Sequence, residues 1–257
     1  MHRLREKEGG CFFIEHPAEF VSNGYLSVDD IGKSFDFAYN MTFGNEGWHR
    51  DHRSGGQVSR KKGEIFIDAF QGKLSEFAFY NLFRRAEVSI KPPDLEIMAE
   101  GLWDSSDFIV NGYAIAVKST KYYGNLLLLE TKDWDDEGRY IPNMNGGVSD
   151  YDFFVLIRIK PDGTSIMKEN RLLYLDRAGY DGLKKLITET TWIANITGFI
   201  TRTELFRDVI KERMILPQNS LLNGKTRMDA ENYYIQAGDL RSMTELSAFL
   251  RNNIKSE

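Results

Sequence analysis

The chain has 257 residues, of which 42% are hydrophobic, 13% aromatic and 28% charged, with a formal net charge of −5. This composition supports a sizeable core and excludes a disordered chain, and the negative charge means that any nucleic-acid site must be a local basic patch. The single cysteine, Cys11, excludes an internal disulfide framework, and no Cys/His cluster has the spacing of zinc ligands.

The N-terminal third predicts two helices. Its opening stretch MHRLREKEGG is too charged for a signal peptide, and no apolar run in the chain reaches membrane-spanning length, so we expect a cytoplasmic protein. Ser27 and Asp30 form a capping-box pattern ahead of the apolar-periodic IGKSFDFAYNM, which predicts a helix. After a basic segment at 49–62, apolar residues at helical spacing predict a second helix over 64–85, with a potential break near Gly72.

Strands dominate the middle of the chain. Four segments are expected to share one mixed central sheet that packs against the 64–85 helix: 107–110, 113–119, 125–130 and 152–159. The last three are near-continuous apolar runs, as in central strands covered on both faces. Further along, the patterns predict a helix at 180–189, a strand at 191–200, a helix opened by Thr201 and Glu204, a polar loop at 216–231, a strand at 233–240 and a last helix capped at Ser242.

The predicted fold class is therefore α/β, a mixed central β-sheet flanked by helices with helical and loop elaborations. We expect a single domain over 1–257. Its core would be 64–160, and 190–257 would complete the sheet and add helices.

The stretch DFIVNGYAIAVKST, residues 107–120, predicts two short strands joined by an Asn-Gly turn. Antiparallel pairing would bring Asp107 beside the 116–118 segment. Period-two alternation would put residues 116 and 118 on one face while Val117 points into the core. An acid and a lysine so placed suit phosphodiester hydrolysis. A metal held by carboxylates neutralises charge on the phosphate and activates a water molecule, which Lys118 would orient.

These residues resemble the PD-(D/E)xK nuclease superfamily, which includes most type II restriction endonucleases. The resemblance covers residues 70–160 and rests on SDFIVNGYAIAVKST, on GKLSEFAF upstream and on YDFFVLIRI downstream. It implies that Asp107 binds the metal and that Lys118 is the catalytic lysine. It also implies that Glu76 is the helical glutamate that joins the metal site in many members.

The activity implied by this resemblance is that of a Mg²⁺-dependent type II restriction enzyme, a hydrolase that cuts double-stranded DNA at a specific sequence. Two-fold protein symmetry mirrors a palindromic site, so the resemblance also implies a homodimer. A cognate DNA methyltransferase is implied in the same restriction-modification system, although not as a physical partner.

Two positions depart from the superfamily pattern. Ser106 stands where a proline often precedes the aspartate, a common variation, but Ala116 occupies the catalytic position of the second carboxylate. Three explanations compete: an engineered acid-to-alanine change, a migrated acid with Glu130 as the nearest candidate, or a natural pseudo-nuclease that only binds DNA. We favour the engineered, inactive variant, because everything around Ala116 is intact and a decayed site would not spare all of it.

The basic segment is the best candidate for phosphate contacts. It carries one acid, Asp51, against five predicted DNA-binding residues: Arg50, Arg53, Arg60, Lys61 and Lys62. Such a segment is ordinarily a charged loop exposed to solvent. A nuclease site nearby would favour the interpretation that it binds DNA. The alternatives to a restriction enzyme are a structure-selective repair or recombination nuclease of the same fold, a catalytically dead DNA-binding module, and an unrelated α/β protein.

Overall fold

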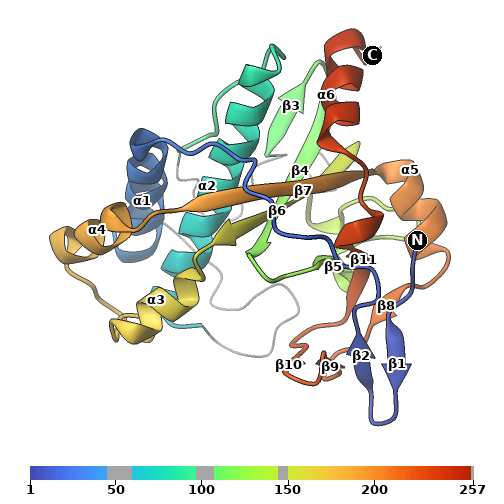
Figure 1. The fold of residues 1–257 in the computed structure, drawn as a ribbon, viewed down its shortest axis with the longest axis horizontal. Helices are drawn as coiled ribbons and strands as arrows, with labels where there is room; N and C mark the ends of the chain where they lie inside the picture. The colour runs from blue at the N-terminus through green and yellow to red at the C-terminus, as the bar shows by residue number, and fades with distance from the viewer. Residues whose placement is uncertain (45–59, 97–106, 144–149, 256–257) are drawn as a thin grey trace.

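The computed structural model describes residues 1–44, 60–96, 107–143 and 150–255 (Figure 1). Arg50 and Arg53, two of the predicted DNA-binding residues, lie outside these described residues. The chain folds as a mixed α/β protein, and this fold class is confirmed.

The principal helices are α1 (Val28–Phe43), α2 (Lys62–Arg85), α3 (Gly163–Glu169), α4 (Tyr180–Glu189) and α6 (Met243–Asn252). A short helix α5 (Arg202–Glu204) continues into a π-helical turn at Leu205–Ile210. The capping box predicted at Ser27 and Asp30 is confirmed, since the Ser27 Oγ accepts from the Asp30 amide at 3.1 Å and the Asp30 carboxylate accepts from the Ser27 amide at 2.8 Å. Helix α2 runs through Gly72 without interruption, so the potential break there was wrong.

The central sheet has four strands in the order β3 (Phe108–Val110), β4 (Tyr113–Lys121), β6 (Phe153–Lys160) and β7 (Ile193–Thr201). β3 and β4 pair antiparallel, β4 and β6 parallel, and β6 and β7 antiparallel, so the sheet is mixed as predicted. The strand predicted at 125–130 forms as β5 (Leu126–Glu130) but not in this sheet. It pairs with β11 (Asn232–Gln236), which in turn pairs with β8 (Ile215–Leu216), in a separate three-stranded sheet.

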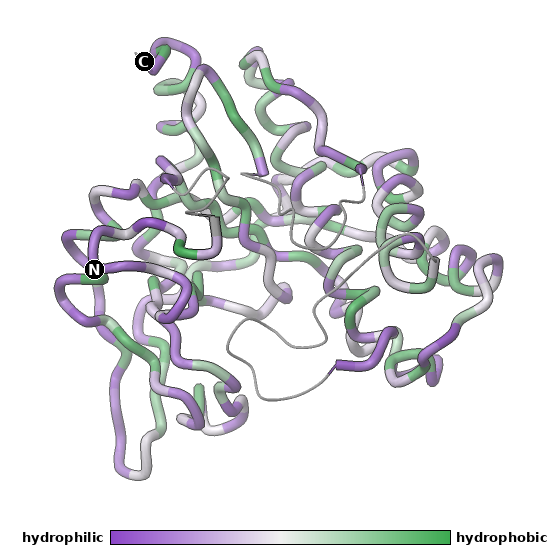
Figure 2. The backbone as a smooth tube through the Cα atoms, turned by 180° about the vertical axis from the view of Figure 1, so that it is seen from behind, coloured by the Kyte–Doolittle hydropathy of each residue, from purple (hydrophilic) through white to green (hydrophobic). Residues whose placement is uncertain are grey.

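The central sheet and the three-stranded sheet are distinct layers of the fold. Strand β4 is covered by helix α2 on one face and by the three-stranded sheet on the other. One face of the central sheet packs on α2 through a helix-side cluster that includes Phe70, Phe79, Phe108, Ile115 and Val155. The other face packs on the three-stranded sheet through an inter-sheet cluster that includes Ala116, Leu127, Phe154, Leu156 and Ile235. Strand β5 therefore lies across the central sheet as a second layer, where Leu126, Leu127 and Leu129 are buried without main-chain pairing to β4. Figure 2 shows hydrophobic residues recurring along the strands and helices, and many hydrophilic residues on the outer loops.

A small third sheet was missed by the sequence analysis. It joins the N-terminal hairpin, β1 (Arg5–Lys7) and β2 (Cys11–Phe13), to β9 (Leu221–Leu222) and β10 (Thr226–Arg227). Strands of two or three residues are too short to show a period-two pattern, so the 216–231 segment predicted as a polar loop contains two of them.

One buried arginine ties the N-terminal segment to the sheets. Arg158 on β6 is 1% exposed, and its guanidinium donates to the backbone carbonyls of Ala18 and Glu19 and to the side-chain oxygens of Asn125 and Asn195. No carboxylate within the described residues pairs with it, and burial lowers the pKa of this guanidinium. Arg158 therefore acts as a polar anchor for residues 18–19 rather than as part of an ion pair.

Candidate functional site

The 107–120 stretch forms the hairpin that the sequence predicts. Asn111 and Gly112 both have positive φ, 50° and 84°, which is the geometry of the tight turn that an Asn-Gly pair favours. The pairing of β3 with β4 sets Phe108 across from Ile115 and Val110 across from Tyr113. The turn is held from outside as well, because the Asn111 side chain donates to the Leu250 carbonyl at 2.7 Å at the end of α6.

Asp107 precedes β3 and contacts the neighbouring strand directly. Its Oδ2 accepts a hydrogen bond from the backbone amide of Val117 at 2.6 Å. The side chain is half-buried. The structure therefore brings Asp107 to the 116–118 segment, in the position that the hairpin register requires.

Ala116 and Lys118 lie on the face of β4 that is turned toward the three-stranded sheet. Ala116 is 1% exposed and belongs to the inter-sheet cluster, opposite Phe154 in the register of β4 with β6. Lys118 is half-buried and its main chain pairs with Leu156, but no hydrogen bond or ion pair joins its ammonium group to another of the residues that the structure describes. The lysine is thus available to a ligand, whereas the side chain at 116 is surrounded by apolar groups.

Glu76 lies on α2, which covers the other face of the sheet. Its carboxylate is 2.7 Å from the ammonium group of Lys73, and the side chain is 14% exposed. Lys73 also donates to the Asp94 carbonyl at 2.7 Å and lies over the ring of Phe37. Glu76 therefore takes part in a buried polar group of the helix, on the side of the sheet opposite to Ala116.

Glu130, the alternative acid, ends β5 in the three-stranded sheet. Its main chain pairs with Asn232, and its Oε2 atom is buried. Because the leucines of β5 pack across the inter-sheet cluster from Ala116, Glu130 belongs to the layer that faces the 116 position. The sequence predicts β5 as a strand of the central sheet, so its position in the layer that covers this sheet was not expected.

The donor set at the hairpin does not fit a complete magnesium site. Magnesium is held by one or two carboxylates together with waters and substrate phosphates. Here position 116 offers a methyl group, and Oδ2 of Asp107 already accepts from a backbone amide. Within the described residues, no group of three His, Cys, Asp or Glu ligands forms around Asp107.

Two of the three described residues of the basic segment pair with acids. Arg60 pairs with Asp68 at 3.1 Å, and Lys61 pairs with Asp176 at 3.4 Å. Lys62 begins α2, seventeen residues before Phe79, whose ring packs on Phe108 at 4.9 Å. At 1.5 Å per residue, Lys62 is roughly 25 Å along the helix from the hairpin. One DNA duplex that contacts both Lys62 and the hairpin would therefore have to span this distance.

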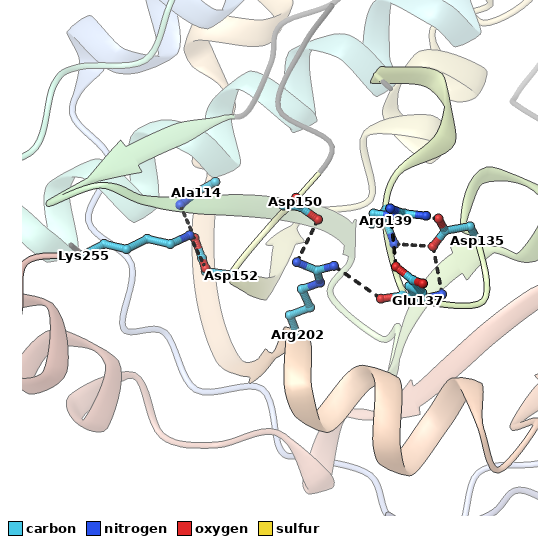
Figure 3. Close-up of polar contacts among 8 residues, drawn as sticks. All are labelled: Ala114, Asp135, Glu137, Arg139, Asp150, Asp152, Arg202 and Lys255. Carbon is cyan, nitrogen blue, oxygen red and sulfur yellow. Dashed lines mark hydrogen bonds and ion pairs between the residues drawn. The ribbon is translucent and has the colours of Figure 1, made fainter. Parts of the chain in front are cut away.

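A second polar region, which sequence reasoning missed, lies where β4 and β6 begin (Figure 3). Asp152 accepts from the Ala114 amide at 2.8 Å and pairs with Lys255 at 2.7 Å. Arg202 pairs with Asp150 at 2.8 Å. Nearby, burial alone would raise the pKa of Asp135, but hydrogen bonds from Arg139 and the Glu137 amide hold that pKa below its ordinary value.

This region borders a pocket of about 420 Å³ with an aromatic wall and charged groups at its rim. Its lining includes Tyr113, Asp152, Phe199, Arg202, Arg241 and Phe249. Tyr113 and Phe199 pack on the helix-side cluster, so the pocket is on the opposite side of β4 from Ala116. The pocket is therefore not the predicted nuclease site.

Comparison of the chain with family models, with curated proteins and with solved structures found no match. In the part of the chain that the structure describes, no helix combines the length and apolar character needed to cross a membrane.

Proposed function

We propose that this chain is a double-stranded DNA endonuclease of the PD-(D/E)xK type, related in chemistry to type II restriction enzymes, whose centre is incomplete because Ala116 replaces an acid. In this form it binds duplex DNA and cleaves it little or not at all. A homodimer belongs to the same proposal, because two-fold protein symmetry mirrors a palindromic DNA site. A cytoplasmic location is also part of the proposal.

The observation that supports this proposal is the pairing of Asp107 with the Val117 amide at 2.6 Å. It puts one carboxylate beside the strand that carries Lys118, whose ammonium group has no partner among the described residues. With an acid at position 116, that acid and Asp107 would hold Mg²⁺, which would supply the charge neutralisation for phosphodiester hydrolysis. The chain's own contribution would be to orient the phosphate through Lys118 and to supply a carboxylate through Asp107.

A second candidate function is a natural pseudo-nuclease that binds DNA without cutting it. The observation that favours it is the surroundings of Ala116, which is 1% exposed among Phe154, Leu156 and Leu127. A carboxylate in that position would be costly unless a cation accompanied it. An apolar environment around position 116 is what we expect if alanine is the natural residue there.

Both candidate functions include binding of duplex DNA at Lys118, and this binding can be tested directly. Affinity for a duplex oligonucleotide is measured by fluorescence anisotropy over a range of salt concentrations for the unchanged chain, Lys118→Met and Lys118→Arg. Methionine keeps most of the apolar stem and loses the charge, so Lys118→Met should weaken binding and reduce the slope of log K against log salt by about one. Lys118→Arg keeps the positive charge, so it should retain both the affinity and the slope of the unchanged chain.

The matched control is Lys185→Met, because Lys185 is an exposed lysine on α4 that pairs only at 3.9 Å with Glu189. It should leave affinity and slope unchanged. Equal binding by Lys118→Met and the unchanged chain would remove Lys118 from the DNA-binding surface and contradict the proposal.

A further inference from the structure

Two histidines and one aspartate converge at the N-terminal end of the chain, far in sequence from the hairpin. The Nδ1 atoms of His2 and His16 lie 2.5 Å and 2.9 Å from the same oxygen, Oδ1 of Asp239. The two imidazole rings have their centroids 4.2 Å apart. Within the described residues, this is the one group of three His, Cys, Asp or Glu side chains whose ligand atoms all lie within 4.8 Å of one another.

A buried amide holds the two histidine segments together. Gln236, which ends β11, is 0% exposed. Its Oε1 accepts from the backbone amides of Glu15 and His16, both at 2.7 Å, and its Nε2 donates to the carbonyls of His2 and Arg3 at 2.9 and 3.1 Å. One side chain therefore satisfies four backbone groups and fixes both histidines relative to β11.

Asp239 lies three residues after Gln236, at the end of the short 3-10 turn that follows β11. The His2 amide donates to its Oδ2 at 2.8 Å, and the amide of Gly238 donates to the His16 carbonyl at 3.0 Å. A Cβ at position 238 would lie 2.8 Å from that carbonyl oxygen and 2.9 Å from Nδ1 of His16, so glycine is required for this close approach. These hydrogen bonds hold the backbone at His2, His16 and Asp239 in place without a ligand, so the three side chains are preorganised.

The group is open to solvent on the side of the imidazoles and closed behind the carboxylate. The side chains of His2 and His16 are 64% and 42% exposed, whereas that of Asp239 is 6% exposed. An ion can therefore reach the nitrogen atoms, and the carboxylate cannot turn away into water.

We propose that His2, His16 and Asp239 form a binding site for a borderline divalent cation, with Zn²⁺ as the ion that fits best. Neutral imidazole binds metals through Nδ1 when its proton is on Nε2, and two imidazoles with one carboxylate are a ligand set typical of zinc. Zinc lies about 2.0–2.1 Å from such ligands, so ligand atoms in a tetrahedral site are about 3.3 Å apart. The 2.5 and 2.9 Å contacts would lengthen by less than about one ångström, and water would supply the fourth ligand.

The bound ion would clamp the N-terminal segment to β11. Residues 2–3 and 15–16 flank the β1–β2 hairpin, which Figure 1 shows projecting from the body of the molecule. The ion would therefore stabilise the folded chain by mass action and raise its thermal midpoint. This inference does not depend on the proposed nuclease function.

The test is calorimetric titration of the intact chain with ZnCl₂ at neutral pH, with Co²⁺ absorption as a probe of tetrahedral geometry. We expect one equivalent to bind, a rise in the thermal midpoint, and visible absorption of a four-coordinate Co²⁺ site. His2→Gln and His16→Gln should each weaken zinc binding by about tenfold or more. Asp239→Asn should do the same, and if that variant unfolds the two histidine variants still decide the result, because both side chains are substantially exposed.

The matched control is the double variant His49→Gln/His52→Gln, which removes the two other histidines of the chain. It should bind zinc like the unchanged protein. Absence of stoichiometric binding to the unchanged chain would overturn the proposal. So would unchanged affinity in His2→Gln and His16→Gln, or loss of binding in the control variant.

Discussion

The carboxylate of Asp107 accepts a hydrogen bond from the Val117 amide at 2.6 Å, so it has a structural role in the hairpin whatever chemistry it performs. That bond ties the residue before β3 to the middle of β4. It also explains why an acid at this place is not by itself a sign of catalysis, because a backbone amide away from water needs an acceptor and a carboxylate can supply one.

Asparagine at position 107 separates the two roles of Asp107. The amide oxygen in Asp107→Asn can still accept from Val117, so the variant should retain most of its stability and lose any function that needs a negative charge. Asp107→Ala leaves the amide unsatisfied, which should cost about 1–3 kcal/mol in the free energy of unfolding. Urea unfolding of both variants checks this, and equal stability of Asp107→Ala and the unchanged chain would contradict the structural role.

The buried guanidinium of Arg158 should be sensitive to replacement by lysine. Lysine cannot reproduce the planar fork that serves Ala18, Glu19, Asn125 and Asn195. Arg158→Lys should therefore destabilise the fold by about 3 kcal/mol, because buried acceptors lose their donors. The control Arg207→Lys, in an exposed pair with Asp208, should unfold at the same urea concentration as the unchanged chain. A tolerated Arg158→Lys would show that the anchor is not needed.

Asp162 gives a pH-dependent prediction. Burial alone would raise its pKa, but Lys121 at 3.1 Å, together with Ser165 and Tyr123, holds the pKa below the ordinary value of 3.8. A carboxyl with a depressed pKa in the folded state contributes stability above its unfolded pKa and loses it as the pH falls through the folded value. Asp162→Asn keeps the N-cap of α3, since asparagine caps helices as well as aspartate does.

The expected result is that Asp162→Asn is less stable than the unchanged chain at pH 7 and that the difference shrinks as the pH falls below 3.8. Urea unfolding at a series of pH values measures it. A stability difference that is independent of pH would mean that the Lys121 pair contributes nothing to folding.

The basic segment predicts a salt-dependent phenotype. Neutralising Arg50, Arg53, Arg60, Lys61 and Lys62 together should weaken duplex binding and flatten its dependence on salt, because each lost phosphate contact lowers the slope by about 0.9. Arg60 and Lys61 already pair with acids, so their share should be smaller than that of Lys62, the third described residue of the segment. Neutralising the exposed residues Lys168, Lys185 and Lys211 is the control. An unchanged slope in the first variant would place the segment away from DNA.

Local signals in the sequence predicted local structure well. The capping box at Ser27, the Asn111-Gly112 turn and the apolar runs of β4 and β6 each depend on a few neighbouring residues, and each forms as expected. The position of β5 was wrong because an apolar run indicates burial but not the layer in which a strand is buried.

The candidate sites also differ in whether neighbouring residues or the tertiary fold determine them. The approach of Asp107 to the 116–118 segment follows from a hairpin register, which a turn sequence can fix. The group of His2, His16 and Asp239 joins residues up to 237 positions apart through Gln236, and no spacing rule for metal ligands covers such a distance. Asp152 and the aromatic pocket likewise depend on how α6 packs against β7 of the central sheet.

The central claim, that this hairpin is a nuclease centre lacking one carboxylate, is tested most directly by restoring the acid. Plasmid DNA is incubated with Mg²⁺ and three proteins: the unchanged chain, Ala116→Glu, and Ala116→Glu combined with Lys118→Ala. We expect no cleavage by the first, discrete double-strand cuts by the second and loss of cutting in the third, since a missing electrostatic stabiliser typically costs about a hundredfold or more in rate. Efficient cleavage by the unchanged chain would transfer the catalytic role to another acid such as Glu130, and a folded, DNA-binding Ala116→Glu protein that cuts nothing would contradict the claim.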